Sequence, residues 1–253
     1  MIHIKYGLLP SLQEMVDPSA PLLFGCEYEI EDLISIPSRI PNIIIETDGS
    51  LRNGGKEFIS SPLNLENTLE TFSTLHSNIS HGSKAFSDRT SIHVHVNCMN
   101  LELYQVRNIV LLYALFEECF FRMVEPTRRD NIHCVALTET FLPAIYRAPI
   151  HSMVCKWHKY TALNLKPLVT QGTIEFRHMH GHNDLVLFES WLHVIEKLFS
   201  VGKGFEMSTE SLSKEPLHKT FLSLFGHTGF SGDWEYVWAS MENQLLDVKL
   251  STI

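Results

Sequence analysis

The sequence predicts an α+β protein whose sheet has one apolar face and one polar face that lines an active site. Three short segments, far apart in the chain, support this prediction: residues 25–29 (GCEYE), 91–97 (SIHVHVN) and 173–177 (TIEFR). Successive side chains of a strand point to opposite faces. Each segment therefore places apolar residues on one face and charged, imidazole or amide groups on the other. Stretches with helical spacing lie between these segments, which gives the mixed class.

The predicted strands follow in order along the chain. The first runs near residues 22–30. Two short strands at 43–46 and 56–60 form a hairpin, because Asp48-Gly49 and Asn53-Gly54 between them are turn signals. The alternating segments that begin at residues 91 and 173 supply the later strands.

Three helices are predicted between and after these strands. Residues 65–79 follow Pro62, which ends the hairpin, and residues 101–124 carry an apolar stripe at helical spacing. That stripe indicates core packing. Asn183 or Asp184 can cap a third helix, which ends near the glycines at 202 and 204.

Composition limits the classes of function. The chain has 253 residues, 44% of them hydrophobic, which is typical of a globular protein. A net charge of −9 argues against a broad nucleic-acid or anionic-membrane surface but leaves a local basic patch open. The five scattered cysteines favour free thiols in a reducing compartment. The first residues lack a secretory pattern, and the most apolar stretch stops at Glu117, too short to span a bilayer. We expect a cytoplasmic protein.

The polar faces carry an excess of carboxylates together with a histidine pair. The acidic residues are Glu27, Glu29, Asp48, Glu57 and Glu175, and the histidines are His93 and His95. Oxygen-rich sets of this kind suit Mg²⁺ or Mn²⁺, and crowded carboxylates repel one another unless cations neutralise them. Arg177 points to the same face as Glu175, where a guanidinium can stabilise a transferring phosphoryl group of ATP.

Other readings of these residues remain open. Residues 49–56 come near a P-loop, but Gly55 stands where lysine is required, and neither GxGxxG nor GxSxG occurs. A single ExE or HxH pair is common on solvated strands, and Glu175 with Arg177 can be a surface salt bridge. The cluster of His178, His180 and His182 offers an alternative Zn²⁺ site.

Taken in order, these motifs resemble the carboxylate–amine ligase superfamily built on the glutamine synthetase catalytic fold. The closest resemblance is to its small amidoligase family, which is related to glutamate–cysteine ligase. The matching segments are GCEYEIE (25–31), ETDGSLRNGGKEFISSPL (46–63), SIHVHVN (91–97), RRDNIHC (128–134) and YTALNLKPLVTQGTIEFRHMHGHND (160–184). The chain departs from the family pattern at Ser91-Ile92, where glycine is usual before the HVHV strand.

The resemblance implies a curved, mainly antiparallel sheet with a metal-lined concave face and helices on the other side. We expect residues 1–204 to form this catalytic domain and residues 205–253 to form a helical extension packed on it. The implied metal ligands are Glu27, Glu29, Asp48, Glu57, His93 and Glu175. Glu57 and Arg177 are the expected catalytic residues. His95, Arg177 and Arg129 are expected at ATP phosphates, and Arg129, Asn164 and Lys159 at substrate.

The implied activity is ATP-dependent formation of an amide from a carboxylate and an amine, through an acyl phosphate. The expected partners are ATP, Mg²⁺ or Mn²⁺, a small carboxylate substrate and an amine substrate. Two alternatives stay open: a metal-dependent amide hydrolase that uses His93, His95 and the acidic cluster, and a non-catalytic relic that binds nucleotide or peptide. The sequence identifies neither substrate, nor the group that deprotonates the amine, nor the oligomeric state.

Overall fold

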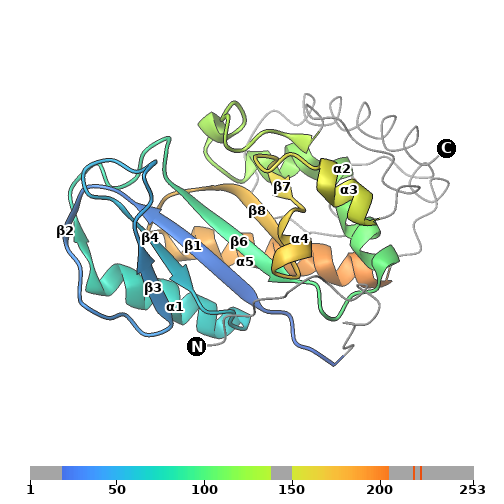
Figure 1. The fold of residues 1–253 in the computed structure, drawn as a ribbon, viewed down its shortest axis with the longest axis horizontal. Helices are drawn as coiled ribbons and strands as arrows, with labels where there is room; N and C mark the ends of the chain where they lie inside the picture. Colours follow the sequence, from blue (N-terminus) through green and yellow to red (C-terminus); the bar gives the residue numbers. More distant parts are fainter. Residues whose placement is uncertain (1–18, 138–149, 205–218, 220–222, 224–253) are drawn as a thin grey trace.

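A six-stranded sheet forms the centre of the protein, seen in a computed structural model that describes residues 19–137, 150–204, 219 and 223. Its strand order is β3-β4-β1-β6-β8-β7, and every neighbouring pair is antiparallel (Figure 1). The strands are β1 (Phe24–Ile30), β3 (Ile43–Glu46), β4 (Lys56–Ser60), β6 (Ser91–Asn97), β7 (Leu163–Asn164) and β8 (Thr173–His180). Two short strands, β2 (Leu33–Ser35) and β5 (Ser80–His81), pair separately. The α+β class and the antiparallel sheet are confirmed.

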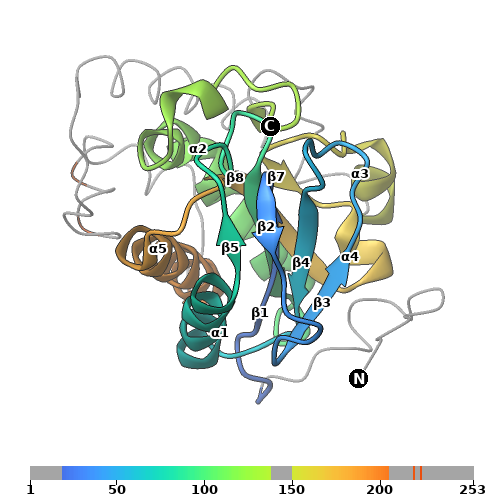
Figure 2. The same cartoon turned by 90° about the vertical axis from the view of Figure 1, so that its left-hand side faces the viewer.

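Three longer helices accompany the sheet: α1 (Leu65–Asn78), α2 (Leu103–Arg122) and α5 (Leu185–Gly204). Shorter helical segments are η2 (Pro126–Arg128), α3 (Ile150–Lys156) and α4 (Pro167–Thr170). Helices α1 and α5 lie on one side of the sheet, and α3 and α4 lie on the other (Figure 2). In the part of the chain that is described, no helix has the length and apolarity to cross a membrane. The predicted extension at 205–253 falls outside this part, apart from positions 219 and 223.

The local signals in the sequence explain where these elements begin and turn. The side chain of Asn64 accepts a hydrogen bond from the Asn67 amide at the start of α1. Asp184 caps α5, as predicted, because its Oδ1 accepts from the amides of Val186 and Leu187. The turn between β3 and β4 uses left-handed backbone at Asn53 and Gly54, with φ of 51° and 70°.

One face of the sheet is covered by helices and forms the core. The Tyr28 ring of β1 lies 5.7 Å from Phe72 of α1 and 5.9 Å from Phe188 of α5, centroid to centroid. Burying one such aromatic side chain stabilises the fold by about 1.5–3 kcal/mol. Cys26 lies on the same face, and burial raises the pKa of its thiol to about 12. Cys26 is thus a free thiol that packs in the core.

Strand register aligns the polar residues on the opposite face. Glu27 pairs with His93, Glu29 pairs with Glu57, and His95 pairs with Glu175. Between β6 and β8 the register shifts: Val94 faces Phe176, whereas Ile92 faces Met179. Two residues of β8, Arg177 and His178, therefore oppose His93 alone. Arg177 lies on the polar face with Glu175, as strand alternation predicted, and His178 points into the core.

Candidate active site

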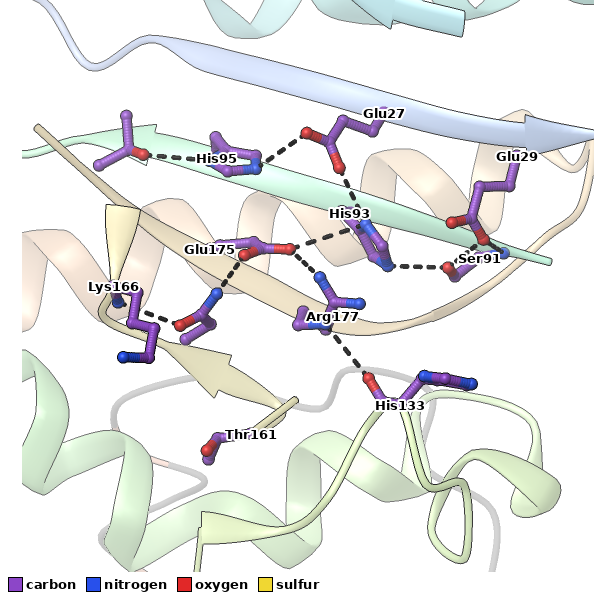
Figure 3. Close-up of polar contacts among 12 residues, drawn as sticks. Glu27, Glu29, Ser91, His93, His95, His133, Thr161, Lys166, Glu175 and Arg177 are labelled. Atoms are coloured by element: carbon purple, nitrogen blue, oxygen red, sulfur yellow. Dashed lines mark hydrogen bonds and ion pairs between the residues drawn. The ribbon is translucent and has the colours of Figure 1, made fainter. Parts of the chain in front are cut away.

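Three neighbouring strands bring Glu27, His93 and Glu175 together on the polar face. One potential ligand atom from each lies within 4.8 Å of the others, and we call this set the first ligand group (Figure 3). The Nδ1 atom of His93 lies 2.9 Å from Oε2 of Glu27 and 3.6 Å from Oε1 of Glu175. The strand alternation seen in the sequence predicted that these side chains share a face. The antiparallel pairing of β1, β6 and β8 makes them neighbours.

Neighbouring polar groups hold the carboxylates of the first ligand group in place. The Nδ2 atom of Asn164 donates to Oε2 of Glu175 at 2.6 Å, and Nε2 of His95 lies 3.3 Å from Oε1 of Glu27. Burial alone would raise the pKa of Glu27. Hydrogen bonds from His93 and His95, with their positive charge, instead hold that pKa well below its ordinary range. Burial alone would lower the pKa of His95, but the hydrogen bond and the negative charge of Glu27 raise that pKa above its usual value.

A second ligand group consists of Glu29, Asp48 and Glu57, whose potential ligand atoms also lie within 4.8 Å of one another. Glu29 is buried on β1, Glu57 faces it across the ladder to β4, and Asp48 comes from the turn after β3. Partial burial raises the pKa of Glu57 to about 7, and the charges of Glu27, Glu29, Asp48 and Glu46 add to the rise. Three acidic groups so placed favour a bound cation.

Arg177 lies between the first ligand group and a neighbouring loop. Its NH1 atom forms an ion pair with Oε1 of Glu175, and its Nε atom donates to the carbonyl of His133 at 3.2 Å. Its amide donates to the carbonyl of Ala162. The side chain is 15% exposed, so the guanidinium can still meet a ligand on the polar face.

Arg128 supports Arg177 from the backbone side, a role that the sequence did not indicate. The strand β7 pairs with only two residues of β8, Glu175 and Phe176. Just beyond them, Arg128 donates from NH2 to the Arg177 carbonyl at 2.6 Å and from Nε to the His178 carbonyl at 3.0 Å. Arg128 is 2% exposed, so it is not a solvated surface charge. Two consecutive arginines in a predicted loop, Arg128 and Arg129, give no indication in the sequence that one of them is buried.

The remaining predicted substrate contacts have other neighbours. Arg129 donates to Oε1 of Glu118 on α2 at 3.0 and 2.7 Å, and its guanidinium lies 5.3 Å from the Phe121 ring centroid. Lys159 is exposed, with its ammonium 4.5 Å from the Tyr160 ring centroid. These contacts do not test the expected substrate roles of Arg129 and Lys159, which stay predictions.

The alternative Zn²⁺ site is not assembled. The His178 ring is buried, with Nε2 2.7 Å from the Tyr113 hydroxyl, and His182 accepts from the Asp184 amide through Nδ1. Burial lowers the pKa of His178 to about 3 and that of His182 to about 4. Within the described ranges, neither group of potential metal ligands includes His178, His180 or His182.

Comparison with known proteins places the chain in a family. Residues 45–197, more than half of the chain, match the family model described as "Putative amidoligase enzyme". No curated protein matches. Among solved structures, the bifunctional glutathione synthetase from Pasteurella multocida is 12% identical with a TM-score of 0.45, and the match covers 92% of this chain and 48% of that one. The chain spans about half of that protein, and at this score the similarity supports no functional argument.

The family match covers much of the polar face. It contains Asp48, Glu57, His93 and Glu175 and begins after Glu27 and Glu29. The resemblance first noted in the sequence motifs is thus shown by an independent comparison. The chain belongs to the amidoligase family.

Proposed function

We propose that the protein is an ATP-dependent carboxylate–amine ligase that forms an amide through an acyl phosphate. The observation that carries this proposal is the pair of ligand groups on one face of the sheet, with Arg177 in contact with the first. We also propose that this face is the concave, metal-lined side of a catalytic domain of the glutamine synthetase kind.

The donor sets fit divalent cations. Mg²⁺ takes oxygen ligands at about 2.0–2.1 Å in an octahedron, so two ligands of one ion lie at most about 4.2 Å apart. In each group the potential ligand atoms lie within 4.8 Å of one another, so small side-chain movements bring them into this range. The first group would hold a cation through Glu27, His93 and Glu175, and the second through Glu29, Asp48 and Glu57. Bound cations would reduce the repulsion between a carboxylate nucleophile and the polyphosphate.

The reaction has two steps. A carboxylate oxygen of the substrate attacks the γ-phosphorus of ATP, the bond to the β,γ-bridging oxygen breaks, and ADP leaves. The amine nitrogen then attacks the acyl carbon, phosphate leaves with the former carboxylate oxygen, and the nitrogen loses a proton. Arg177 is placed to offset negative charge on the transferring oxygens, which in other phosphoryl-transfer enzymes contributes about 10³-fold or more to the rate.

The other polar residues support these steps in distinct ways. Asn164 orients Glu175, because its Nδ2 donates to Oε2 and its own Oδ1 accepts from the Lys166 amide. His95 orients Glu27 and contacts the Thr173 hydroxyl at 3.0 Å. We propose that His95 also meets metal or phosphate, and that Arg129 and Lys159 meet the anionic substrate.

Two rival functions account for fewer of these features. A metal-dependent hydrolase would use the first ligand group to activate water. Such a reaction would need neither Arg177 nor the second ligand group. A non-catalytic relic would be expected to have lost part of the set. All six predicted ligands are present and fall into two groups. The intact site, more than the fold, favours the ligase.

The test is product formation by the purified protein. Mg²⁺, ATP and a panel of amino acids as carboxylate and amine substrates should give ADP, phosphate and a product whose mass is the sum of two substrates less one water. Glu175→Gln should abolish ADP release, whereas Glu66→Gln, an exposed change in the first turn of α1, should not. Amide hydrolysis without ATP would contradict the proposal.

A further inference from the structure

Ser91 stands between the two ligand groups at the start of β6. Its side chain is buried, and its hydroxyl lies 2.5 Å from Oε2 of Glu29 and 2.8 Å from Nε2 of His93 (Figure 3). Its amide also donates to Oε2 of Glu29, at 2.8 Å. Glu29 belongs to the second group and His93 to the first. One hydroxyl therefore connects the two groups.

The chemistry of these atoms fixes the direction of each hydrogen bond. An ionised carboxylate only accepts, so the Ser91 hydroxyl proton points to Glu29. The same oxygen must then accept from His93, which requires a proton on Nε2 of that ring. We infer this proton on Nε2 from the hydrogen-bond network. With Nε2 committed to Ser91, Nδ1 is the ring nitrogen that faces Glu27 and Glu175. Without a cation Nδ1 donates its proton in a hydrogen bond to Glu27, and a ligated metal would take the place of that proton.

We propose that Ser91 is a positioning residue that couples the two cation sites. It holds His93 in the tautomer whose Nδ1 can ligate in the first group, and through two hydrogen bonds on Oε2 it fixes the Glu29 carboxylate of the second. The inference rests on the proposed function for the cations, but the network itself consists of contacts within this chain. Groups that orient a metal-ligating histidine in this way are worth about 10- to 100-fold in metal affinity.

The experiment measures Mn²⁺ binding without substrate, by the loss of the free Mn²⁺ signal in electron paramagnetic resonance. Wild-type protein should bind two Mn²⁺ per chain, one for each ligand group. Ser91→Ala removes the hydroxyl but keeps the amide, and it should weaken binding about 10- to 100-fold. Ser91→Thr keeps the hydroxyl and should stay within about threefold of wild type, because the histidine keeps its partner.

Ser60→Ala is the matched control. Ser60 is another buried serine of the same sheet, and its hydroxyl accepts from the Cys26 amide at 2.8 Å. The substitution removes the same atom and leaves both ligand groups intact, so Mn²⁺ affinity should equal that of wild type. Far-UV circular dichroism of each variant checks that it is folded.

The possible outcomes separate this inference from the proposed function. If wild type binds Mn²⁺ and Ser91→Ala binds it equally well, Ser91 does not couple the sites and the inference alone fails. If wild type binds no Mn²⁺, the inference and the cation sites fail together. If Ser91→Ala does not fold, ¹⁵N resonances of the His93 ring in wild type decide instead. A proton on Nε2, with Nδ1 responding to added Cd²⁺, supports the proposal, and a proton on Nδ1 alone overturns it.

Discussion

Replacing Arg177 with methionine removes the guanidinium while keeping most of the aliphatic chain. The loss leaves Glu175, which is 4% exposed, with Asn164 and His93 as neighbours. Removing one partner of a buried ion pair costs about 3–5 kcal/mol, and the remaining donors place this case at about 3 kcal/mol without cations. In catalysis, a loss of about 10³-fold in ATP turnover corresponds to about 4 kcal/mol of transition-state stabilisation.

Divalent cations should affect the loss of stability and the loss of ATP turnover in Arg177→Met differently. Arg177 and a cation compete for Oε1 of Glu175, so Arg177→Met should bind Mn²⁺ at least as tightly as wild type. Saturating Mg²⁺ should then restore much of the lost thermal stability, because the cation replaces the guanidinium as the partner of Glu175. ATP turnover should not return, since the charge at the transferring oxygens is still missing.

The assay combines thermal denaturation, Mn²⁺ titration and ADP release on the same preparations. Arg39→Met, which removes an exposed guanidinium, serves as the control and should match wild type in all three. The reasoning is refuted if Arg177→Met turns over ATP at the wild-type rate, or if it loses Mn²⁺ binding together with activity. The second result would make Arg177 a structural partner of the ligands and not a group for phosphoryl transfer.

Three further predictions address neighbouring groups. Arg128→Lys should lower kcat about 10²-fold with little change in KM, as measured by steady-state kinetics. An ammonium cannot hold the carbonyls of Arg177 and His178 in the fixed geometry of a guanidinium. A displacement of Arg177 by about 1 Å is enough to cause a loss of that size. Arg129→Ala should raise the KM for the carboxylate substrate more than it lowers kcat, and equal loss of both constants would contradict a binding role. Glu57 has its pKa raised to about 7, so cation-free stability should fall as the pH rises from about 4.5 to 7. The Mg²⁺-induced shift in Tm should therefore grow over that range, and Glu57→Gln should flatten the dependence.

Local patterns predicted most of the elements that position the site. Alternation located β1, β6 and β8, and the turn signals located the hairpin of β3 and β4 with its bounds. The prediction that Glu27, His93 and Glu175 share a face needed only the period of a strand and the assumption of one sheet. Their mutual contact depended on strand order, which the residues alone did not indicate. The family resemblance implied only a mainly antiparallel sheet with these residues on its metal-lined face.

Features that depend on register or on distant partners could not be read from the sequence. The bulge at Arg177 and His178 arises from pairing with β6, and the burial of Arg128 follows from the carbonyls it meets there. Glu117 marked the end of an apolar stretch, yet in the structure both it and Glu118 are buried, and Glu118 pairs with Arg129. Ser91 gave no signal beyond its departure from glycine. A small hydroxyl acquires a role only when two acidic or basic neighbours are brought to it.

The most direct test of the ligase mechanism follows the oxygen atoms. A carboxylate substrate labelled with ¹⁸O is incubated with the protein, Mg²⁺, ATP and an amine, and the released phosphate is analysed by mass spectrometry. If an acyl phosphate forms, one labelled oxygen passes from the carboxylate to each phosphate released with the amide. Phosphate without label, formed while the amide accumulates, would contradict the acyl-phosphate mechanism, and amide cleavage that proceeds without ATP would favour the hydrolase.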